Sequence, residues 1–377
     1  MNLLGILRRL SRPLLTALAF FTIVLLWSLD YITGPELSPL IFYVIPVVLV
    51  VWLLGRRTAM FFSLVAAFAY YLADLLTGRD YSHPAIRYWN AAEKLIFFLL
   101  VVQLVATLKA ALEREKLARQ EFLEREIRIA EQVQERLLPQ SPPLLTTLEC
   151  AGICQPVRSV GGDYYDFLPL QPGRVGIAVG DVSGKGLSAA LLMASLQATL
   201  RSFASVRGEA AGEIVADTNR QMCALTETAR FVTLFWATYD DVRRELTYVN
   251  AGHNHPMLFR AGAADGHPER LESGGTVVGL FPLATWRERT IRLDPGDVLL
   301  IYTDGVPEAA NASGEEFGDA RLEAVVRANR DLPARALCER ILREITAFLE
   351  NESPQDDLTV LVARAVGAST EKPRNGV

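Results

Sequence analysis

The sequence predicts a membrane module of four helices followed by an α+β domain, in which helices cover antiparallel sheets. Three observations lead to this fold class. Four long apolar runs lie within residues 1–108, charged residues dominate 109–138, and strand-like blocks precede pairs of helical blocks over 146–365. Consecutive strands followed by paired helices are typical of antiparallel sheets, rather than of a parallel βαβ array. A chain of 377 residues has room for two domains and a connector.

Residues 1–108 carry the membrane prediction. The apolar runs cover residues 14–33, 37–55, 58–77 and 89–108. Each run is close to the roughly 20 residues that cross about 30 Å of hydrocarbon. A cleaved signal peptide would explain the first run but not the next three. We therefore predict a four-span transmembrane module that is surrounded by membrane lipid.

Basic residues set the predicted orientation of the spans. Arg8, Arg9 and Arg12 precede the first span, and Arg56 and Arg57 lie between the second and the third. Short loops rich in Lys and Arg stay on the cytoplasmic side of a membrane. The N-terminus and, after four crossings, the C-terminal domain are therefore expected in the cytoplasm of a multi-pass protein of the cell (inner or plasma) membrane.

Three carboxylates lie near the expected outer boundary of the spans, namely Asp30, Asp74 and Glu93. Carboxylates at that depth can bind a proton, a cation or a small ligand, or they can simply reach the headgroup region, and the sequence leaves both interpretations open. The segments DYITGPE (30–36) and FYVIPVVLVVWLLGRR (42–57) resemble a four-helix module that recurs before bacterial signalling output domains.

A helical connector is predicted for residues 109–139. Residues 109–138 contain neither Pro nor Gly, and their apolar side chains recur mostly every three or four residues, before Pro139 ends the helix. The apolar positions are Leu108, Leu112, Leu123, Ile127, Ala130, Val133 and Leu137. Such a coiled-coil-like stripe between Glu and Arg residues favours a parallel two-stranded coiled coil, and hence a homodimer. For the last two turns, packing onto the chain's own C-terminal domain is an equally good interpretation.

The C-terminal domain is predicted from blocks of β-branched and aromatic residues and from apolar helical blocks. The expected strands cover residues 148–155, 163–170, 174–182, 231–239, 245–251, 298–303 and 358–363. The expected helices cover residues 187–206, 210–226, 319–329 and 333–349.

Aspartates beside tight-turn residues carry the chemical prediction. Their contexts are Gly-Gly-Asp163, Gly-Asp181-Val, Thr-Asp304-Gly and Asp356-Asp357, each at the end of a predicted strand. Carboxylates gathered there repel one another unless a cation lies among them, and oxygen ligands favour Mg²⁺ or Mn²⁺ over Zn²⁺ or Cu²⁺. A single Asp of this kind is more often a turn residue, but four in the same context predict a divalent metal site.

Other classes of site are disfavoured. The net charge of −5 offers no basic face for a nucleic-acid partner. The four cysteines form no CxxC pair and no C-x5-R loop of a thiol phosphatase. The segment Gly184-Lys185-Gly186 lacks the GxxxxGK[ST] pattern and is interpreted as a turn. His253 and His255 could ligate a metal, but residues in such a segment more commonly fix a turn.

Six ordered motifs resemble one known family. They are RSVGGDYYDF (158–167), GDVSGKGLSAALLMA (180–194), YVNAGHNHP (248–256), YTDGVPEA (302–309), EFG (316–318) and QDDLTV (355–360). Over residues 130–364 the chain resembles the SpoIIE/RsbU-like branch of the PPM (PP2C-type) phosphatases, and AEQVQERLLP (130–139) is similar to the helix that precedes this domain in the family. The resemblance implies a PP2C-like α-β-β-α sandwich of antiparallel sheets for residues 140–366, and a disordered tail is expected at 367–377.

The resemblance also implies a role for each predicted metal ligand. Asp181 corresponds to the carboxylate that bridges two divalent ions, with the Val182 carbonyl on one of them. Asp304 and Asp356 correspond to further ligands of the first ion. Asp163 corresponds to the acidic residue that binds or orients water on the second ion.

Four further residues receive implied roles. Arg158 resembles the arginine that binds the phosphate group of the substrate. Asp357, Glu308 and Gly305 are candidates for supporting the ligands or for holding a third metal ion. Arg158, Asp163 and Asp181 are therefore the residues expected to take part in catalysis.

The function that the resemblance implies is that of a protein serine/threonine phosphatase with two Mn²⁺ or Mg²⁺ ions in each active site. Two ions about 3.5–4 Å apart would activate a water that attacks phosphoserine or phosphothreonine directly. The suggested substrate is a phosphorylated anti-sigma-factor antagonist with a STAS domain, in a signalling pathway. The alternative is a membrane-tethered, non-catalytic interaction module with a phosphatase-like fold. A transporter is disfavoured because the four spans are short and contain few charges.

Overall fold

A computed structural model describes most of the chain, in segments that end where the placement of residues is uncertain. The described residues are 10–33, 40–77, 81–207, 210–225, 230–263, 267–272, 274–350 and 352–367. Two compact units divide the chain, Met1–Leu123 and Glu124–Val377, here called the N-terminal unit and the C-terminal unit. The tail predicted at 367–377 lies outside the described residues apart from Gly367.

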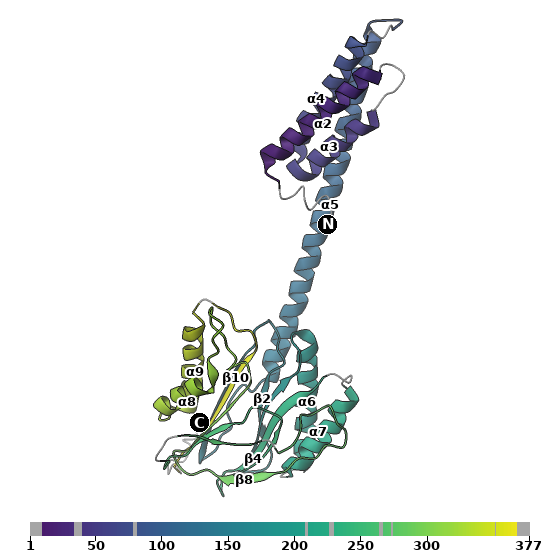
Figure 1. The fold of residues 1–377 in the computed structure, drawn as a ribbon. Coiled ribbons are helices and arrows are strands. Elements are labelled where there is room, and N and C mark those ends of the chain that lie inside the picture. Colours follow the sequence, from purple (N-terminus) through teal and green to yellow (C-terminus); the bar gives the residue numbers. More distant parts are fainter. Residues whose placement is uncertain are drawn as a thin grey trace, which may run out of the picture. The chain divides into compact units, whose positions relative to one another are not determined.

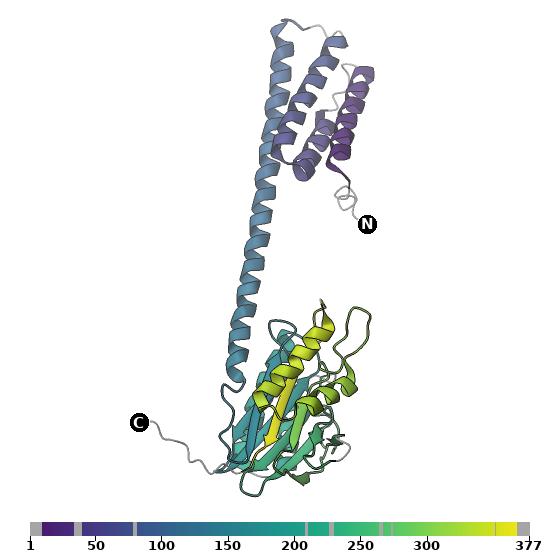
Figure 2. The same cartoon turned by 90° about the vertical axis from the view of Figure 1, so that its left-hand side faces the viewer.

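Among its described residues, the N-terminal unit contains four helices (Figure 1). They are α2 (Arg12–Thr33), α3 (Leu40–Leu54), α4 (Arg56–Leu76) and the first part of α5 (Ala85–Leu137). Each helix contributes to one apolar core, through Ile23, Tyr43, Phe62 and Phe98 respectively. Figure 2 shows α5 as one uninterrupted helix, so the last apolar run and the predicted connector share a single element.

The helices α2, α4 and α5 are each long and apolar enough to cross a membrane, by length and composition. The helix α3 has 15 residues, and residues 37–39 of the second predicted span lie outside the described residues. Large apolar side chains such as Phe21, Phe68 and Leu104 point outward from the N-terminal unit. An apolar surface around a helical unit is typical of contact with lipid.

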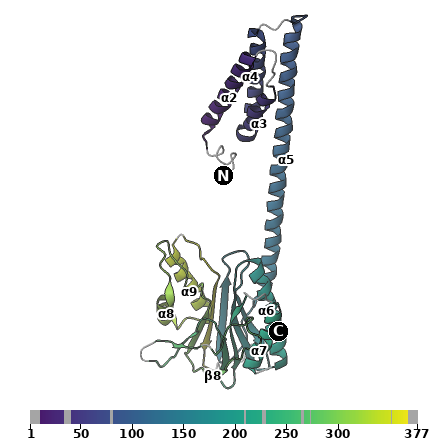
Figure 3. The same cartoon turned by 45° about the vertical axis from the view of Figure 1, so that its right-hand side comes forward.

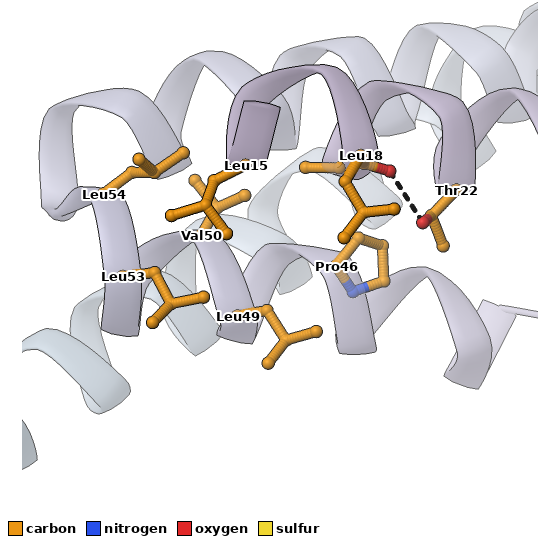
Figure 4. Close-up of a pocket in the computed structure, with 9 residues that line it drawn as sticks. Leu15, Leu18, Thr22, Pro46, Leu49, Val50, Leu53 and Leu54 are labelled. Atoms are coloured by element: carbon orange, nitrogen blue, oxygen red, sulfur yellow. Dashed lines mark hydrogen bonds between the residues drawn. The ribbon is translucent and has the colours of Figure 1, made fainter. Parts of the chain in front are cut away.

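A small apolar cavity lies between α2 and α3 in the N-terminal unit (Figure 4). Its volume is about 60 Å³, and it is lined by Leu15, Leu18, Ala19, Thr22, Pro46, Leu49, Val50, Leu53 and Leu54. The hydroxyl of Thr22 donates to the backbone oxygen of Leu18 at 2.8 Å. The single polar side chain of the lining is therefore already engaged, and the cavity lacks a group that would orient a polar ligand.

The C-terminal unit consists of two five-stranded sheets in which all paired strands are antiparallel. The first sheet has the order β1 (Leu148–Gln155), β10 (Leu358–Ala365), β9 (Val298–Tyr302), β6 (Met257–Phe259), β7 (Glu269–Arg270). The second has the order β2 (Tyr164–Pro169), β3 (Arg174–Val182), β4 (Val232–Asp240), β5 (Glu245–Ala251), β8 (Arg289–Arg292). The helices are α6 (Leu187–Arg207), α7 (Ala211–Leu225), α8 (Gly318–Asn329) and α9 (Ala334–Leu349).

Three hydrophobic cores define the layers of the C-terminal unit. One lies between α8 and α9 and the first sheet, a second lies between the two sheets, and a third lies between the second sheet and α6 and α7. Figure 3 shows the strands between these two helical layers. The predicted α-β-β-α sandwich of antiparallel sheets is confirmed. The helix α6 is apolar enough to pass as a membrane span, but its apolar side belongs to the third core.

The strand β3 illustrates how the sequence specifies both faces of a buried sheet. Val175, Ile177 and Val179 face the core between the sheets, while Ala178 faces the core under α6. This alternation follows from the two-residue period of a strand. At Gly176 an added Cβ would lie 2.6 Å from the Trp236 side chain, so the position has no room for one. A small residue is therefore required where the large indole packs.

The predicted strands and helices match the structure within two residues at each end, where described. Three short strands, β6, β7 and β8, were not predicted, and they have three, two and four residues. A segment of this length carries too few side chains to display a two-residue period.

Candidate active site

Two aspartates meet at one end of the second sheet because of its register. Asp163 directly precedes β2, and Asp181 lies within the last two residues of β3. The antiparallel register pairs Tyr164 with Gly180, so the residues that flank this pair lie at the same end of the sheet. The predicted convergence of these two distant motifs follows directly from the pairing.

The first sheet brings the other two aspartates to the same place. Asp304 follows β9 and Asp356 precedes β10, and these strands are neighbours in the first sheet. The backbone nitrogen of Thr303 donates to the Thr359 oxygen at 3.1 Å, and the Thr303 hydroxyl donates to Oδ2 of Asp163 at 2.7 Å. Thr303 therefore connects the metal-ligand candidate of one sheet to the strand end of the other.

The environment of Asp163 and Asp181 is that of two carboxyl groups sharing a confined space. Asp163 is 3% exposed, and its pKa is raised well above the usual value by burial and then by the charge of Asp181. Burial also raises the pKa of Asp181 to about 7, with further contributions from the charges of Asp304, Asp356 and Asp357. A hydrogen bond with Asp163 acts in the opposite direction on Asp181. The carboxyl groups therefore gather closely enough to influence one another's ionisation.

The outer part of the cluster is acidic as well. The pKa of Asp304 is raised by burial and by the charge of Asp356. Partial burial and the charge of Asp304 raise the pKa of Glu308, whose side chain is exposed. Lys185 Nζ lies 2.6 Å from Oδ2 of Asp356, and this pair is partly exposed. The segment interpreted as a turn thus places a cation at the edge of the cluster.

The side chains are near one another but not drawn together around a point. Within the described ranges, no three carboxylate, imidazole or thiol groups lie close enough to hold one metal ion as they stand. Mutual repulsion of the carboxylates and the ion pair between Lys185 and Asp356 both oppose a closer approach. The donor set nevertheless consists of oxygen atoms alone, which fits Mg²⁺ or Mn²⁺.

Asp357 has a different task from its neighbour. Its Oδ1 accepts the backbone N–H of Val157 at 2.8 Å, and its Oδ2 accepts that of Gly162 at 2.9 Å. Both carboxylate oxygens are therefore used to hold the segment that leads to Asp163. This geometry makes Asp357 a brace of the loop 157–162, and its expected role at a metal site stays a prediction.

Glycines let the backbone segments of the site approach closely. An added Cβ at Gly162 would lie 2.7 Å from the carbonyl oxygen of Val182, a predicted ligand. At Gly305 an added Cβ would lie 2.1 Å from the backbone oxygen of Asp357. Neither position has room for a side chain, which explains the glycines of the GGD and TDG motifs.

Arg158 is exposed and lines a cavity that reaches Asp163. The cavity has a volume of about 330 Å³ and is lined by Glu131, Gln134, Glu135, Leu138, Cys154, Gln155, Pro156, Arg158, Ser159, Gly161 and Asp163. Nη1 of Arg158 lies 3.6 Å from the position of a Cβ at Gly186. The structure therefore places the predicted phosphate-binding residue and a predicted metal ligand along one cavity.

His253 is a buried structural residue. Its Nδ1 and the Thr233 hydroxyl lie 2.9 Å apart, and its backbone N–H donates to Oδ1 of Asn250 at 2.8 Å. Burial lowers the pKa of His253 to about 3, so the ring is neutral at physiological pH. His255 is exposed. The interpretation that His253 fixes a turn agrees with these contacts.

Three residues that the structure places beside the aspartates were not predicted as site residues from the sequence. Thr303 supports Asp163, Lys185 pairs with Asp356, and Gln134 of α5 contacts the loop before Asp163. Thr303 and Lys185 stood inside motifs that were already recognised. Gln134 stood in the predicted connector, where no local pattern distinguishes it from the neighbouring polar residues.

Comparison with known proteins agrees with this fold. The family model for Stage II sporulation protein E (SpoIIE) matches residues 171–366. The chain is 30% identical over 265 residues to Protein IcfG of Synechocystis sp., covering 63% of this chain and 41% of that protein. It is 28% identical over 246 residues to Phosphoserine phosphatase RsbU of Bacillus subtilis, covering 65% and 71% respectively. The match thus spans less than half the length of IcfG.

Solved structures share the architecture of the C-terminal unit. The SiaA-PP2C domain of Pseudomonas aeruginosa superposes with a TM-score of 0.58 at 22% identity, covering 66% of this chain and 98% of that one. A structure of RsbU and RsbW domains from Mycobacterium tuberculosis gives 0.54 at 25% identity, covering 62% and 64%. Since the SpoIIE model covers more than half of the 377 residues and the fold is that of PP2C domains, this chain belongs to the SpoIIE family of PP2C-type phosphatase domains.

Proposed function

We propose that this chain is a membrane-anchored, metal-dependent protein phosphatase that hydrolyses phosphoserine or phosphothreonine. The observation that carries the proposal is the gathering of Asp163, Asp181, Asp304 and Asp356 at adjoining ends of the two sheets, where burial and neighbouring charges raise the pKa of three of them. Membership of the SpoIIE family supports it, and a relative named phosphoserine phosphatase supports the substrate class.

The proposed cofactors are two Mn²⁺ or Mg²⁺ ions. The residues that would hold them are Asp163, Asp181, Asp304 and Asp356, together with the carbonyl oxygen of Val182. All five supply oxygen atoms, as hard cations require. When bound, such ions supply positive charge to the phosphoryl oxygens and make water more acidic.

The chain's own residues would orient the phosphate and the ligands. Arg158 can donate two parallel hydrogen bonds to phosphoryl oxygens, as planar guanidinium groups do. Asp357 holds the backbone at Val157 and Gly162, on either side of Arg158 and next to Asp163. The Thr303 hydroxyl holds one oxygen of Asp163. The phosphate-binding side chain and a metal ligand are thus fixed by one short loop.

The cysteines support direct hydrolysis rather than a covalent intermediate. Burial raises the thiol pKa of Cys150, Cys154, Cys223 and Cys338 above the usual value. A nucleophilic cysteine requires a lowered pKa, because the thiolate is the reactive form. Even Cys154, which lines the cavity beside Asp163, therefore stays protonated. A cysteine nucleophile is therefore disfavoured, and we assign the attack on phosphorus to water.

The test compares Asp181→Asn with Asp331→Asn in the full chain. Asp331 is an exposed acidic residue outside the site and serves as the matched control. Hydrolysis of p-nitrophenyl phosphate and of a phosphoserine peptide with Mn²⁺ should fall by roughly 10²-fold or more in Asp181→Asn, since it removes charge stabilisation of the transition state. Full activity in Asp181→Asn, or no activity in the wild type, would favour the non-catalytic interaction module.

The proposed orientation places the N-terminus and the C-terminal unit in the cytoplasm. Ser82 is exposed in the segment expected outside, and Ser353 is exposed in the C-terminal unit. In intact cells, a membrane-impermeant maleimide should label Ser82→Cys but not Ser353→Cys. The reverse pattern would show that the orientation is inverted.

The proposed partner is a phosphorylated STAS-domain anti-sigma-factor antagonist. The relatives named RsbU and RsbP, and the structure that joins RsbU and RsbW domains, motivate this choice. Phosphate release from a phosphorylated STAS protein should exceed release from an unrelated phosphoserine peptide. Equal rates on both would remove the assignment of this partner while leaving the phosphatase in place.

The proposed homodimer rests on the exposed apolar stripe of the connector. Leu123 lies in the stripe and is exposed, and Glu124 is its exposed neighbour outside the stripe. Oxidation in membranes should link Leu123→Cys chains into dimers far more efficiently than Glu124→Cys chains. Equal, weak linking of both variants would argue for a monomer.

A further inference from the structure

The last turns of α5 contact the backbone immediately before Asp163. Nε2 of Gln134 donates to the carbonyl oxygen of Gly161 at 2.7 Å, and Oε1 of Gln134 accepts the N–H of Gly161 at 3.0 Å. One amide side chain thus satisfies both polar groups of one residue. The two bonds run in opposite directions, so they fix the orientation of the Gln134 amide as well as that of the glycine backbone.

Position 161 has no room for a side chain that could make such hydrogen bonds itself. An added Cβ at Gly161 would lie 2.1 Å from Oδ2 of Asp357, so the position must remain glycine. Asp357 holds the next N–H, that of Gly162, at 2.9 Å. The backbone that leads into Asp163 is therefore held from two sides, by Asp357, which precedes β10 of the first sheet, and by Gln134 of α5.

The end of α5 is itself anchored in the C-terminal unit. The side-chain amide of Gln197, a buried residue of α6, donates to the carbonyl oxygen of Leu137. Leu138 packs against the core between the sheets and against the core under α6. Gln134 therefore stands on a fixed support rather than on a freely moving helix end.

We infer that Gln134 is a positioning residue for the proposed metal site, an inference that rests on the proposed function. It holds the Gly161 backbone so that Asp163 keeps its place beside Asp181 and the Thr303 hydroxyl. Gln134 acts through Asp163 and touches neither phosphate nor metal ion. Residues that orient a metal ligand commonly change metal affinity when they are replaced.

The test compares Gln134→Ala with Gln132→Ala in the full chain. Gln132 lies on the same turn of α5 and is exposed, so it is the matched control. In metal-free protein, hydrogen–deuterium exchange of the segment 157–163 should be faster in Gln134→Ala, because the Gly161 N–H loses its acceptor. Calorimetric titration should show roughly tenfold weaker Mn²⁺ binding in Gln134→Ala. Gln132→Ala should match the wild type in both measurements.

A second variant covers the case in which Gln134→Ala does not fold. Gln134→Glu keeps an acceptor for the Gly161 N–H but loses the donor to the carbonyl oxygen, so its exchange and Mn²⁺ affinity should lie between wild type and Gln134→Ala. Wild-type exchange and affinity in whichever variant folds would overturn the inference.

The same measurements separate this inference from the proposed function. If the wild-type chain binds Mn²⁺ and hydrolyses p-nitrophenyl phosphate, and Gln134→Ala has wild-type exchange and Mn²⁺ affinity, only the positioning role is removed. A wild-type chain that neither binds Mn²⁺ nor hydrolyses phosphate removes the proposed function.

Discussion

Two buried aspartates, Asp74 in the N-terminal unit and Asp163 in the C-terminal unit, have opposite surroundings. Asp74 in the N-terminal unit is 5% exposed, and its oxygens accept from the Tyr81 hydroxyl at 2.7 Å and from Arg87 Nε at 3.2 Å. Asp163 in the C-terminal unit is 3% exposed, but the largest charge effect on its pKa comes from another aspartate, Asp181. A buried carboxylate beside a guanidinium is already compensated, whereas one beside a carboxylate requires a cation or a proton from solution.

Asp74 therefore has the surroundings of a structural residue, and Asp163 has those of a candidate metal ligand. The contacts of Asp74 lie inside the N-terminal unit, and the adjoining space between Asp30, Tyr70 and Asp74 has essentially no free volume. In the C-terminal unit, Asp163 lines a cavity of about 330 Å³ whose lining also includes Arg158. Burial alone therefore does not identify the site, but burial beside another carboxylate marks Asp163 as a candidate.

Metal removal should separate the two acids most strongly. Chelation with EDTA should reduce phosphatase activity to background, and added Mn²⁺ should restore it, because the aspartate cluster then lacks its compensating charge. Alkylation with N-ethylmaleimide is the control and should leave activity unchanged, since the pKa of all four thiols is raised and none is proposed to act in the reaction. Activity that survives exhaustive chelation would contradict the metal assignment.

Breaking the compensated pair should have the largest effect on the stability of the N-terminal unit. Arg87→Ala removes a guanidinium from the buried Asp74 and should destabilise the unit by about 3 kcal/mol, the lower end of the range for buried pairs. Thermal unfolding in lipid nanodiscs measures the loss. Adding Asp74→Asn to Arg87→Ala should recover part of it, and a double variant no better than Arg87→Ala would show that the charge is not the cause.

The pH dependence of metal-free protein should reveal the uncompensated pair. Because the pKa of Asp181 is raised from 3.8 to about 7, the folded chain binds more protons than the unfolded chain over this interval. The free energy of unfolding of the wild type, relative to Asp181→Asn, should therefore fall with rising pH across that interval, by up to about 1.4 kcal/mol per pH unit, and level off above it. Chemical denaturation in EDTA checks this, and parallel pH curves for the two chains would refute it.

Replacement of Lys185 should have a smaller effect than metal removal, Arg87→Ala or the titration of Asp181. Its ion pair with Asp356 is 43% and 39% exposed at the two side chains, so Lys185→Gln should change stability by less than about 1 kcal/mol. Removing this cation should also strengthen Mn²⁺ binding slightly, because Asp356 no longer has a competing partner. Calorimetric titration measures the change, and weaker binding in Lys185→Gln would indicate that the lysine helps to hold the substrate or the ligands.

Much of the fold of the C-terminal unit could be predicted because its elements carry strong local patterns. The strand β3 alternates large and small apolar residues, and α9 places Leu337, Ile341 and Ile345 on one face. The helix α6 shows the limit of such reasoning. Its mean hydropathy of 1.2 is below the 1.8–2.4 of α2, α4 and α5 but still fits a membrane span, and its packing against the second sheet shows that it belongs to the core.

The candidate ligands could be predicted because each aspartate has a distinctive neighbour in sequence. Gly162 and Gly305 mark places where two backbones approach, so their motifs reported on tertiary structure through a local residue. Gln134 has no such mark. Its contact with Gly161 depends on how the end of α5 is rotated against the domain, and that rotation is set by Leu138 and Gln197, which are distant from the loop in sequence.

Asp356 and Asp357, the two acids directly before β10, should differ in how well they tolerate substitution. Asp357 spends both oxygens on the N–H groups of Val157 and Gly162, while Asp356 lies half-exposed beside Lys185. Exchange of either acid for glutamate would add one methylene. The half-exposed Asp356 side chain has solvent space for it. At Asp357 the added length would disturb the two hydrogen bonds to the backbone. Engineers who wish to change the ion preference should therefore vary Asp356 and leave Asp357 unchanged.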